Sequence, residues 1–340
     1  MSAPTHEEWR KLYDTWSQVK SIAPWDWMFE THLFGVQNPE KDEIGFVSIM
    51  GNLGEHYAAA VYLGTRGLYG FWTFQTVGPH ADPMSYLGIP QIQASFEDRK
   101  ELTDQDRNVI KSLELKFRGS KAWPQFRSFR PGYFPWYLEA NEARFLTAVL
   151  EQVLDVAPRF KANPRLFPPP AKERYLVRVP RREGDSITWA EEERHIPPIE
   201  SIPLMMPMDD DLLDHVRSIP TQRIKLEMDL FMMPSTVREG RGTRPYFPQV
   251  LLVVDVQSGA ILGMEMLAPE PTLESIWERV PLKTLELLAR AGIHPSIIYV
   301  NEGPLAELLQ RLADELGCRL MVRRNLRHMD SIKAMLMTHF

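Results

Sequence analysis

The stretch from residue 224 to residue 322 constrains the fold of this chain more than any other part of the sequence. Its first ten residues alternate polar and apolar side chains, as a strand with one polar face does. Two apolar runs then flank a Gln-Ser-Gly turn and predict a hairpin. Further on, segments with helical periodicity alternate with short apolar runs. The sequence therefore predicts three strands, a helix, a strand, a helix and a strand, at residues 224–233, 249–255, 260–267, 272–290, 297–300, 304–316 and 318–322.

Three short sequence motifs lie within this succession of predicted elements. They are Leu226-Glu-Met-Asp229, Leu252-Val-Val-Asp-Val-Gln-Ser-Gly259 and Val300-Asn-Glu-Gly303. In this order and spacing they resemble the RNase H-like fold in its integrase and transposase form. The resemblance covers roughly the last third of the chain and implies a C-terminal RNase H-like βββαβαβ domain at residues 223–340.

The resemblance also implies where a metal site would lie. Integrase-like enzymes hold two Mg²⁺ ions roughly 4 Å apart with two aspartates and a glutamate. The first aspartate falls on Asp229, but the second falls on Asn301, whose amide brings no charge. Glu302 is adjacent, yet the alternation of a strand turns it to the opposite face unless a bulge re-aims it. The glutamate is expected on a later helix, where residues 334–340 contain no acid and Asp330 is the last one.

This shortage of carboxylates separates two functional hypotheses. The favoured hypothesis is a noncatalytic binding or scaffolding protein, without a cofactor, on a degenerate integrase-like scaffold. The alternative is a nuclease or strand-transfer enzyme that depends on Mg²⁺ and has a rearranged acidic site. The alternative requires Asp229, either Asp255 or Glu302, and Asp330 to converge.

Each candidate residue also has an ordinary structural interpretation. Asp229 shares its strand parity with Lys225 and Glu227 and is expected on a solvated sheet face. Asp255 precedes the Gln-Ser-Gly turn and is expected to accept backbone hydrogen bonds there. Asn301 stands at a strand-to-helix junction, where its side chain is expected to cap the following helix.

Composition restricts the class of protein. The chain has 340 residues, 44% of them hydrophobic, which is enough for two or three globular domains. No apolar run is long enough to span a bilayer, and the first residues do not resemble a secretion signal. The single cysteine, Cys318, excludes an internal disulfide and a cysteine zinc site. We therefore expect a cytoplasmic protein without membrane contact.

The charge of the chain indicates which class of partner to expect. The net charge of −6 argues against general nucleic-acid binding and favours an unknown protein partner. The tail is locally basic, however, and would flank the substrate cleft of an RNase H-like domain, so nucleic acid remains an alternative partner. The candidate contact residues are Arg319, Arg323, Arg324, Arg327 and Lys333.

The first part of the chain predicts an α+β domain at residues 1–166. Amphipathic patterns predict helices at 7–21 and 138–156, and Thr103 followed by acids predicts a helix start. Three prolines at 168–170 predict a stiff boundary. Residues 167–222 are expected to form a proline-rich connection with a hairpin at 174–180 and 186–191. Strands are predicted at 43–50, 57–63, 68–74 and 89–96, with a turn at 64–67.

Two further short motifs, Trp25-Asp-Trp-Met28 and Pro131-Gly-Tyr133, precede the C-terminal pattern. Together with that pattern they resemble an uncharacterised bacterial protein family whose C-terminal domain is RNase H-like. Trp25, Trp27 and Met28 are expected to anchor a core. The aromatic content of the N-terminal domain leaves a third functional hypothesis, small-ligand binding, for which the sequence indicates no site.

Overall fold

The computed structural model describes residues 2–78, 83–168, 173–184, 186–198, 207–221, 223–270 and 272–339. The chain divides into two compact units. Unit 1 comprises Met1–Arg130 and Pro135–Glu200, and unit 2 comprises Pro131–Phe134 and Ser201–Phe340. The last two prolines of the predicted boundary, and residues 199–206 of the predicted connection, lie outside the described residues. Both units are mixed α+β structures, in agreement with the expected class.

Unit 1 is built on a seven-stranded sheet with the strand order β5-β4-β3-β2-β1-β6-β7. Strands β1 and β6 are parallel, and the other neighbours are antiparallel. The strands are β1 (Phe34–Gln37), β2 (Ile44–Met50), β3 (Tyr57–Leu63), β4 (Gln91–Glu97), β5 (Trp123–Phe129), β6 (Arg174–Glu183) and β7 (Ser186–His195). The helices are α1 (His6–Ile22), α2 (Gly64–Val77), α3 (Pro83–Leu87), α4 (Asp104–Ser112) and α5 (Ala140–Ala162).

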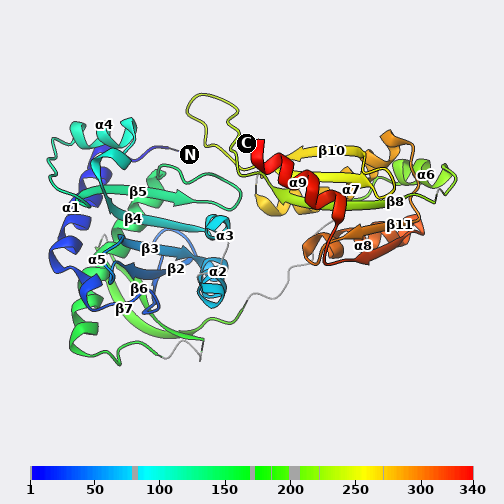
Figure 1. Ribbon diagram of the computed structural model, residues 1–340. Helices are drawn as coiled ribbons and strands as arrows, with labels where there is room; N and C mark the ends of the chain where they lie inside the picture. The colour runs from blue at the N-terminus through cyan, green and yellow to red at the C-terminus, as the bar shows by residue number, and fades with distance from the viewer. Residues whose placement is uncertain are drawn as a thin grey trace. The chain divides into compact units, whose positions relative to one another are not determined.

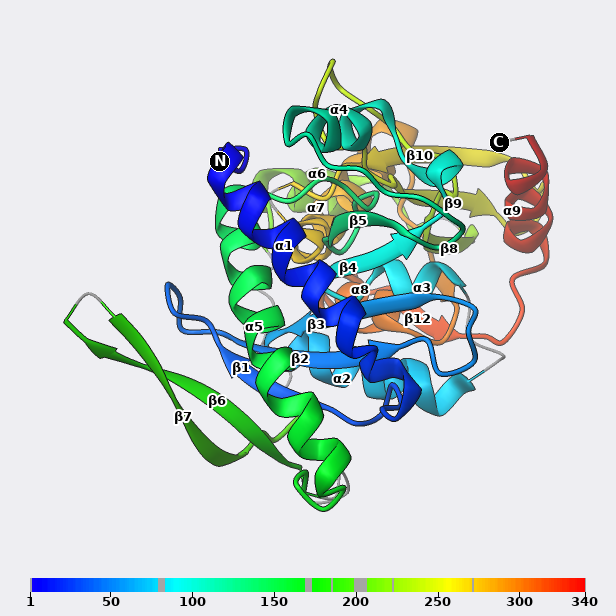
Figure 2. The same ribbon diagram turned by 90° about the vertical axis from the view of Figure 1, so that its left-hand side faces the viewer.

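Helices cover both faces of this sheet (Figure 1). Helices α1 and α5 lie side by side on one face, over the larger core of the unit (Figure 2). Trp16 of α1 stacks on Phe96 of β4 with 4.7 Å between ring centroids. The expected anchors Trp25 and Met28 are buried in this core, and Trp27 packs against it partly buried. Helix α2 covers part of the other face.

The predicted strand at 68–74 and the turn before it are wrong, because these residues belong to α2. Gly67, Leu68 and Phe71 are the buried residues of this helix and share one helical face. A Cβ atom at Gly67 would approach the backbone of Tyr62 to 2.7 Å, so only glycine lets the helix start so close to β3. A short apolar run fits a strand and a buried helix equally well, which explains the error.

Unit 2 is built on a five-stranded sheet with the strand order β10-β9-β8-β11-β12. Strands β8, β9 and β10 are antiparallel, whereas β8, β11 and β12 run parallel. The strands are β8 (Lys225–Met232), β9 (Gln249–Asp255), β10 (Ile261–Leu267), β11 (Ile297–Val300) and β12 (Arg319–Val322). The helices are α6 (Asp210–Ser218), α7 (Leu273–Ala291), α8 (Pro304–Leu316) and α9 (Arg327–His339). The predicted succession of strands and helices is confirmed.

Two cores lie on opposite faces of this sheet. Helices α6, α7 and α8 cover one face, and side chains such as Leu226 and Val253 point into their core. Helix α9 covers the other face, which contributes Phe231, Leu252 and Tyr299 (Figure 1). Helix α6 was not predicted, although Asp209 caps it by accepting a hydrogen bond from the backbone nitrogen of Leu212 at 2.9 Å. No helix in the described part of the chain is long and apolar enough to cross a membrane.

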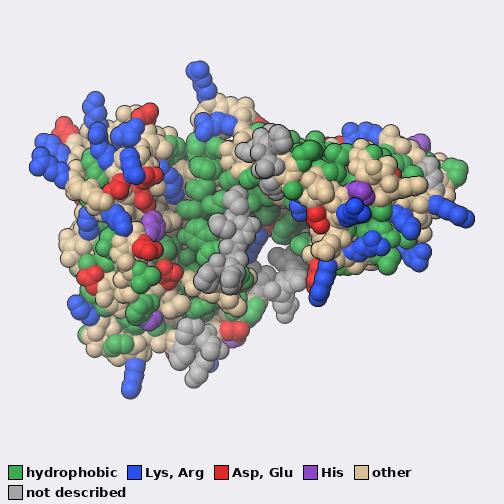
Figure 3. Space-filling model, in the orientation of Figure 1, with side chains coloured by type: hydrophobic (Ala, Val, Ile, Leu, Met, Phe, Trp, Pro, Cys, Tyr) green, Lys and Arg blue, Asp and Glu red, His purple; other side chains and the backbone are tan. Residues whose placement is uncertain are grey.

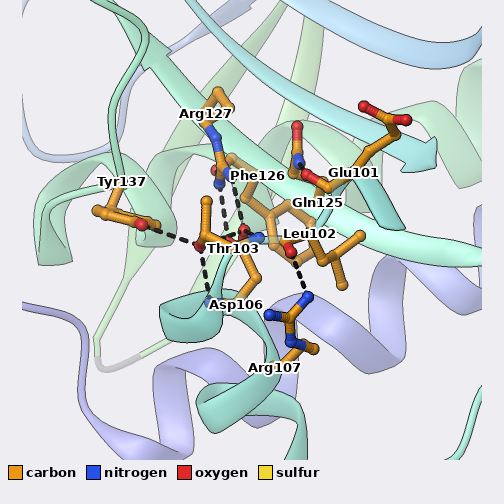
Figure 4. Close-up of polar contacts among 9 residues, drawn as sticks. All are labelled: Glu101, Leu102, Thr103, Asp106, Arg107, Gln125, Phe126, Arg127 and Tyr137. Atoms are coloured by element: carbon orange, nitrogen blue, oxygen red, sulfur yellow. Dashed lines mark hydrogen bonds and ion pairs between the residues drawn. The ribbon is translucent and has the colours of Figure 1, made fainter. Parts of the chain in front are cut away.

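A buried ion pair fastens α4 to the edge strand β5 in unit 1 (Figure 4). Arg127 donates to both carboxylate oxygens of Asp106, at 2.8 and 2.6 Å. Thr103 caps α4 as predicted, and its backbone nitrogen and hydroxyl both donate to Asp106. The Tyr137 hydroxyl completes the network by donating to the Thr103 hydroxyl at 2.9 Å.

Burial raises the pKa of Asp106. The hydrogen bonds and the charge of Arg127, together with the hydrogen bonds from Thr103, lower the pKa by more, so that it lies below its ordinary value. The carboxylate therefore contributes stability that is complete above the unfolded pKa of about 4. This contribution is lost as the pH falls through the lower pKa of the folded state.

Replacing Asp106 by Asn is expected to lower the free energy of unfolding of unit 1 by about 3 kcal/mol at pH 7, because Arg127 keeps a buried charge without its partner. Urea unfolding followed by tryptophan fluorescence measures this, since eight of the nine tryptophans belong to unit 1. Asp104→Asn is the control, because the Asp104 side chain is 91% exposed and should contribute under about 1 kcal/mol. The difference between wild type and Asp106→Asn should shrink below about pH 4; a constant difference would contradict this account.

Candidate functional site

The candidate site lies on the central strand of unit 2, on the sheet face that α9 covers. Glu227 and Asp229 point to this face from β8 and are only 3% and 8% exposed. The expectation that Asp229 lies on a solvated face is therefore wrong. The alternation of the strand was interpreted correctly, but the polar face is covered by a helix about one hundred residues further along the chain.

Lys333 of α9 provides the counter-charge for Asp229. Its Nζ atom lies 2.6 Å from Asp229 Oδ2, and the two side chains are 28% and 11% exposed. The second carboxylate oxygen accepts a hydrogen bond from the backbone nitrogen of Leu230 at 2.9 Å. Lys333 Nζ also lies 5.0 Å from the centroid of the Phe231 ring. The Lys333 ammonium group therefore neutralises the charge of Asp229.

Glu227 anchors the start of α9. Its Oε2 atom accepts hydrogen bonds from the backbone nitrogens of His328 at 3.0 Å and Met329 at 2.9 Å. These amides belong to the first turn of the helix, whose N–H groups have no partner within the helix and whose dipole favours a negative charge. Both buried carboxylates of β8 are thus compensated by the same helix.

Asn301 directly follows β11, the parallel neighbour of β8. In the parallel pairing of β11 with β8, Val300 lies opposite Met228, so the chain leaves the sheet at Asn301 where β8 continues with Asp229. The Oδ1 atom of Asn301 is buried and accepts no hydrogen bond from the described residues. The expected capping role of Asn301 is wrong, because α8 begins after Gly303 without a side-chain cap.

The remaining acids are not gathered around Asp229. Glu302 is exposed. Asp255 Oδ2 accepts hydrogen bonds from the hydroxyl and backbone nitrogen of Ser258, as the turn interpretation predicted, and these bonds lower its pKa. Asp330 accepts a hydrogen bond from the backbone nitrogen of Leu326 at 3.2 Å. Across the described ranges, no group of three or more His, Cys, Asp or Glu side chains is arranged to hold a metal ion.

The basic residues of the tail divide into two sets. Lys333 is engaged with Asp229, whereas the arginines are exposed. Arg323 lies over the Tyr299 ring, with 3.5 Å between the guanidinium carbon and the ring centroid. Lys and Arg side chains are spread over the face of unit 2 that carries α9 (Figure 3). The exposed candidates are Arg319, Arg323, Arg324 and Arg327.

Sequence reasoning found Asp229, Asn301 and Lys333 but did not connect them. It also missed Glu227 as the anchor of α9. A signal was available in the sequence, because Met329, Ile332 and Leu336 recur at helical spacing around Lys333 and form an apolar face that needs a partner. Only the tertiary structure shows that this partner is the polar face of β8.

Replacing Lys333 by Met is expected to lower the free energy of unfolding of unit 2 by about 2 kcal/mol, because Asp229 would keep a buried charge without a counter-charge. Asp229→Asn should cost less, since the partly exposed ammonium can reach water. The double variant should be more stable than the sum of the two changes predicts. Hydrogen exchange of the α9 amides and urea unfolding measure these effects.

Lys283→Met is the matched control for this cycle. Lys283 pairs with Glu286 on the same helix, with side chains 31% and 33% exposed. Its loss should cost under about 0.5 kcal/mol. Strictly additive effects of Lys333→Met and Asp229→Asn would contradict a direct coupling between the two charges.

Comparison with known proteins places the chain among domains of unknown function. No curated protein matches it. One solved structure, "CryoEM structure of simian T-cell lymphotropic virus intasome in complex with PP2A regulatory subunit B56 gamma", contains a chain that is 18% identical, over 35% of this chain and 41% of that chain. The match thus spans less than half the length of that chain, and its TM-score of 0.24 is too low to assign a shared fold.

Two family models match the sequence. Residues 9–178 match "Domain of unknown function (DUF7309)", and residues 212–337 match "Domain of unknown function (DUF6930)". Neither description specifies an RNase H-like domain or a bacterial source. Because the first match spans half of the chain, the protein belongs to the DUF7309 family, with a DUF6930 match in its C-terminal part.

Proposed function

We propose that unit 2 is an RNase H-like domain of the integrase type that has exchanged metal chemistry for an internal ion pair. The protein then acts as a noncatalytic binding module. Support comes from the sheet, in which three antiparallel strands precede two parallel ones and the first strand lies at the centre. Asp229 lies on β8 and Asn301 directly follows the neighbouring strand β11, as the first two metal ligands of such enzymes do.

The observation that carries the proposal is the contact of 2.6 Å between Lys333 Nζ and Asp229 Oδ2. Two dications need several anionic oxygens, because the charges of the ions repel each other strongly at short distance. Here one candidate ligand is a neutral amide and the other is neutralised by an ammonium. A metal ion at Asp229 would have to displace Lys333 and would meet one full negative charge.

The alternative, a metal-dependent nuclease with a rearranged acidic site, receives no comparable support. It requires Asp255, Glu302 or Asp330 to join Asp229. Asp255 accepts a hydrogen bond from a backbone N–H group of a turn, and Asp330 accepts one from a backbone N–H group at the start of α9. Glu302 is exposed at the start of the connection to α8.

We propose a protein as the partner of this module. Strand β12 is the last strand of its sheet, and its residues Met321 and Val322 are 42% and 55% exposed. An edge strand can accept an extended segment of another protein through its backbone groups. The exposed Arg319, Arg323 and Arg324 favour an acidic segment. The proposal also includes a bacterial origin, which the family resemblance of the sequence motifs implies. It further includes a cytoplasmic location, which the single cysteine favours.

The absence of metal chemistry is tested with Mg²⁺ and Mn²⁺ on single-stranded and double-stranded DNA and RNA. Wild-type protein and Asp229→Asn are expected to leave all substrates intact. Metal-dependent cleavage that is lost in Asp229→Asn would refute the proposal and establish the nuclease alternative.

A gain of metal binding gives a positive test of the same idea. The double variant Asn301→Asp, Lys333→Met would place two carboxylates at neighbouring positions without the ammonium. It is expected to bind Mn²⁺ at least about tenfold more tightly than wild type in an electron paramagnetic resonance titration, since each added carboxylate strengthens a hard-cation site. The control variant is Lys283→Met. Equal Mn²⁺ binding by wild type and the double variant would contradict the assigned geometry.

The choice of a protein partner over nucleic acid is tested by fluorescence anisotropy with labelled DNA and RNA. We expect binding no tighter than the nonspecific range, with Kd above about 10⁻⁶ M at physiological salt. The double variant Arg323→Glu, Arg324→Glu should bind these probes with a Kd in the same range as that of the wild type. Tight, salt-sensitive binding that this variant abolishes would make nucleic acid the partner.

A further inference from the structure

A cleft in unit 1 lies on the sheet face that α2 covers only in part. It has a volume of about 470 Å³, within the range of sites for small molecules. Strands β3, β4 and β5 form its floor, and α2 and α3 contribute to its wall. This cleft belongs to unit 1 and is independent of the function proposed for unit 2.

Polar side chains of β4 and of the edge strand β5 lie on the floor of the cleft. Gln93, Ser95 and Gln125 alternate with core residues along β4 and β5 and so point to the cleft. Gln93 and Ser95 are only 8% and 4% exposed. Among the described residues, no donor bonds to the side-chain oxygen of any of these three residues. Buried polar groups normally have such partners, so this floor retains the capacity to accept hydrogen bonds.

Aromatic side chains form one wall. Tyr86 lies between Phe74 and Phe129, with ring centroids 5.5 and 5.8 Å away. The Tyr86 hydroxyl donates to the side-chain oxygen of Gln91 at 3.0 Å. Gln91 is fully buried, and its Nε2 atom has no acceptor in the described part of the chain. An unpaired buried donor costs free energy.

The charges of the cleft exclude anionic ligands. Glu30 and Glu97 line it, and the only guanidinium among its lining residues, that of Arg127, is neutralised by Asp106 at 2.6 Å. His56 lies between Gln93 and Glu97. Its Nε2 atom is 2.9 Å from the amide nitrogen of Gln93, and its Nδ1 atom is 3.6 Å from a carboxylate oxygen of Glu97. The cleft thus offers an aromatic wall, hydrogen-bond acceptors and negative charge.

From these features we infer that the cleft binds a small planar heterocycle that carries an amino group and no phosphate, of the chemical class of the cytosine and adenine nucleosides. The ring lies against the wall formed by Phe74, Tyr86 and Phe129. The two N–H bonds of the amino group donate to the floor oxygens of Ser95 and Gln125, and the Gln93 oxygen lies beside them on the same floor. A phosphate on the ligand would be repelled by Glu30 and Glu97.

The test titrates the full-length protein with matched ligand pairs by isothermal titration calorimetry. Cytidine and uridine differ in an amino group against a carbonyl, as do adenosine and inosine. At least one amino nucleoside is expected to bind with Kd below about 1 mM, and its carbonyl counterpart at least about fivefold more weakly. The corresponding 5′-monophosphate should bind more weakly than the nucleoside.

Variants locate the binding. Ser95→Ala and Gln125→Leu each remove one acceptor and should weaken binding about two- to tenfold. Gln18→Leu, an exposed change on α1, is the control and should not alter binding. Melting temperatures establish that each variant is folded. The inference is overturned if neither amino nucleoside binds, if each carbonyl counterpart or monophosphate binds as tightly, or if folded Ser95→Ala and Gln125→Leu bind like wild type.

Discussion

Two carboxylates on the central strand of unit 2 must be compensated, and helix α9 compensates both. Glu227 receives the first-turn amides of the helix, and Asp229 receives the ammonium of Lys333. An uncompensated charge at this depth would cost several kcal/mol. The position of α9 on the sheet is therefore fixed by charge as well as by the apolar contacts of Leu326 and Met329.

The neutral side chain of Asn301 fits this arrangement. A third carboxylate next to Asp229 would repel it and would require a further cation. An amide avoids that repulsion but leaves its own buried oxygen without a hydrogen bond from the described residues. The residue types at these positions thus agree with one internal cation, the ammonium of Lys333.

Local patterns predicted much of the structure, and long-range contacts account for the failures. Alternation and periodicity predicted the succession of elements in unit 2, and cap chemistry predicted the turn at Asp255 and the helix start at Thr103. The burial of Asp229 was missed because its partner is 104 residues away. In unit 1, the polar residues of β4 were visible in the sequence, but nothing local indicated that their side of the sheet forms a cleft.

The central claim is that the Lys333 ammonium holds the place of a metal ion beside Asp229. It is tested most directly by anomalous diffraction from crystals of the wild-type protein soaked in manganese. The account predicts no manganese peak within bonding distance of the Asp229 carboxylate, with Lys333 Nζ remaining in contact with it. A manganese ion bound to Asp229, with Lys333 turned away, would contradict the account.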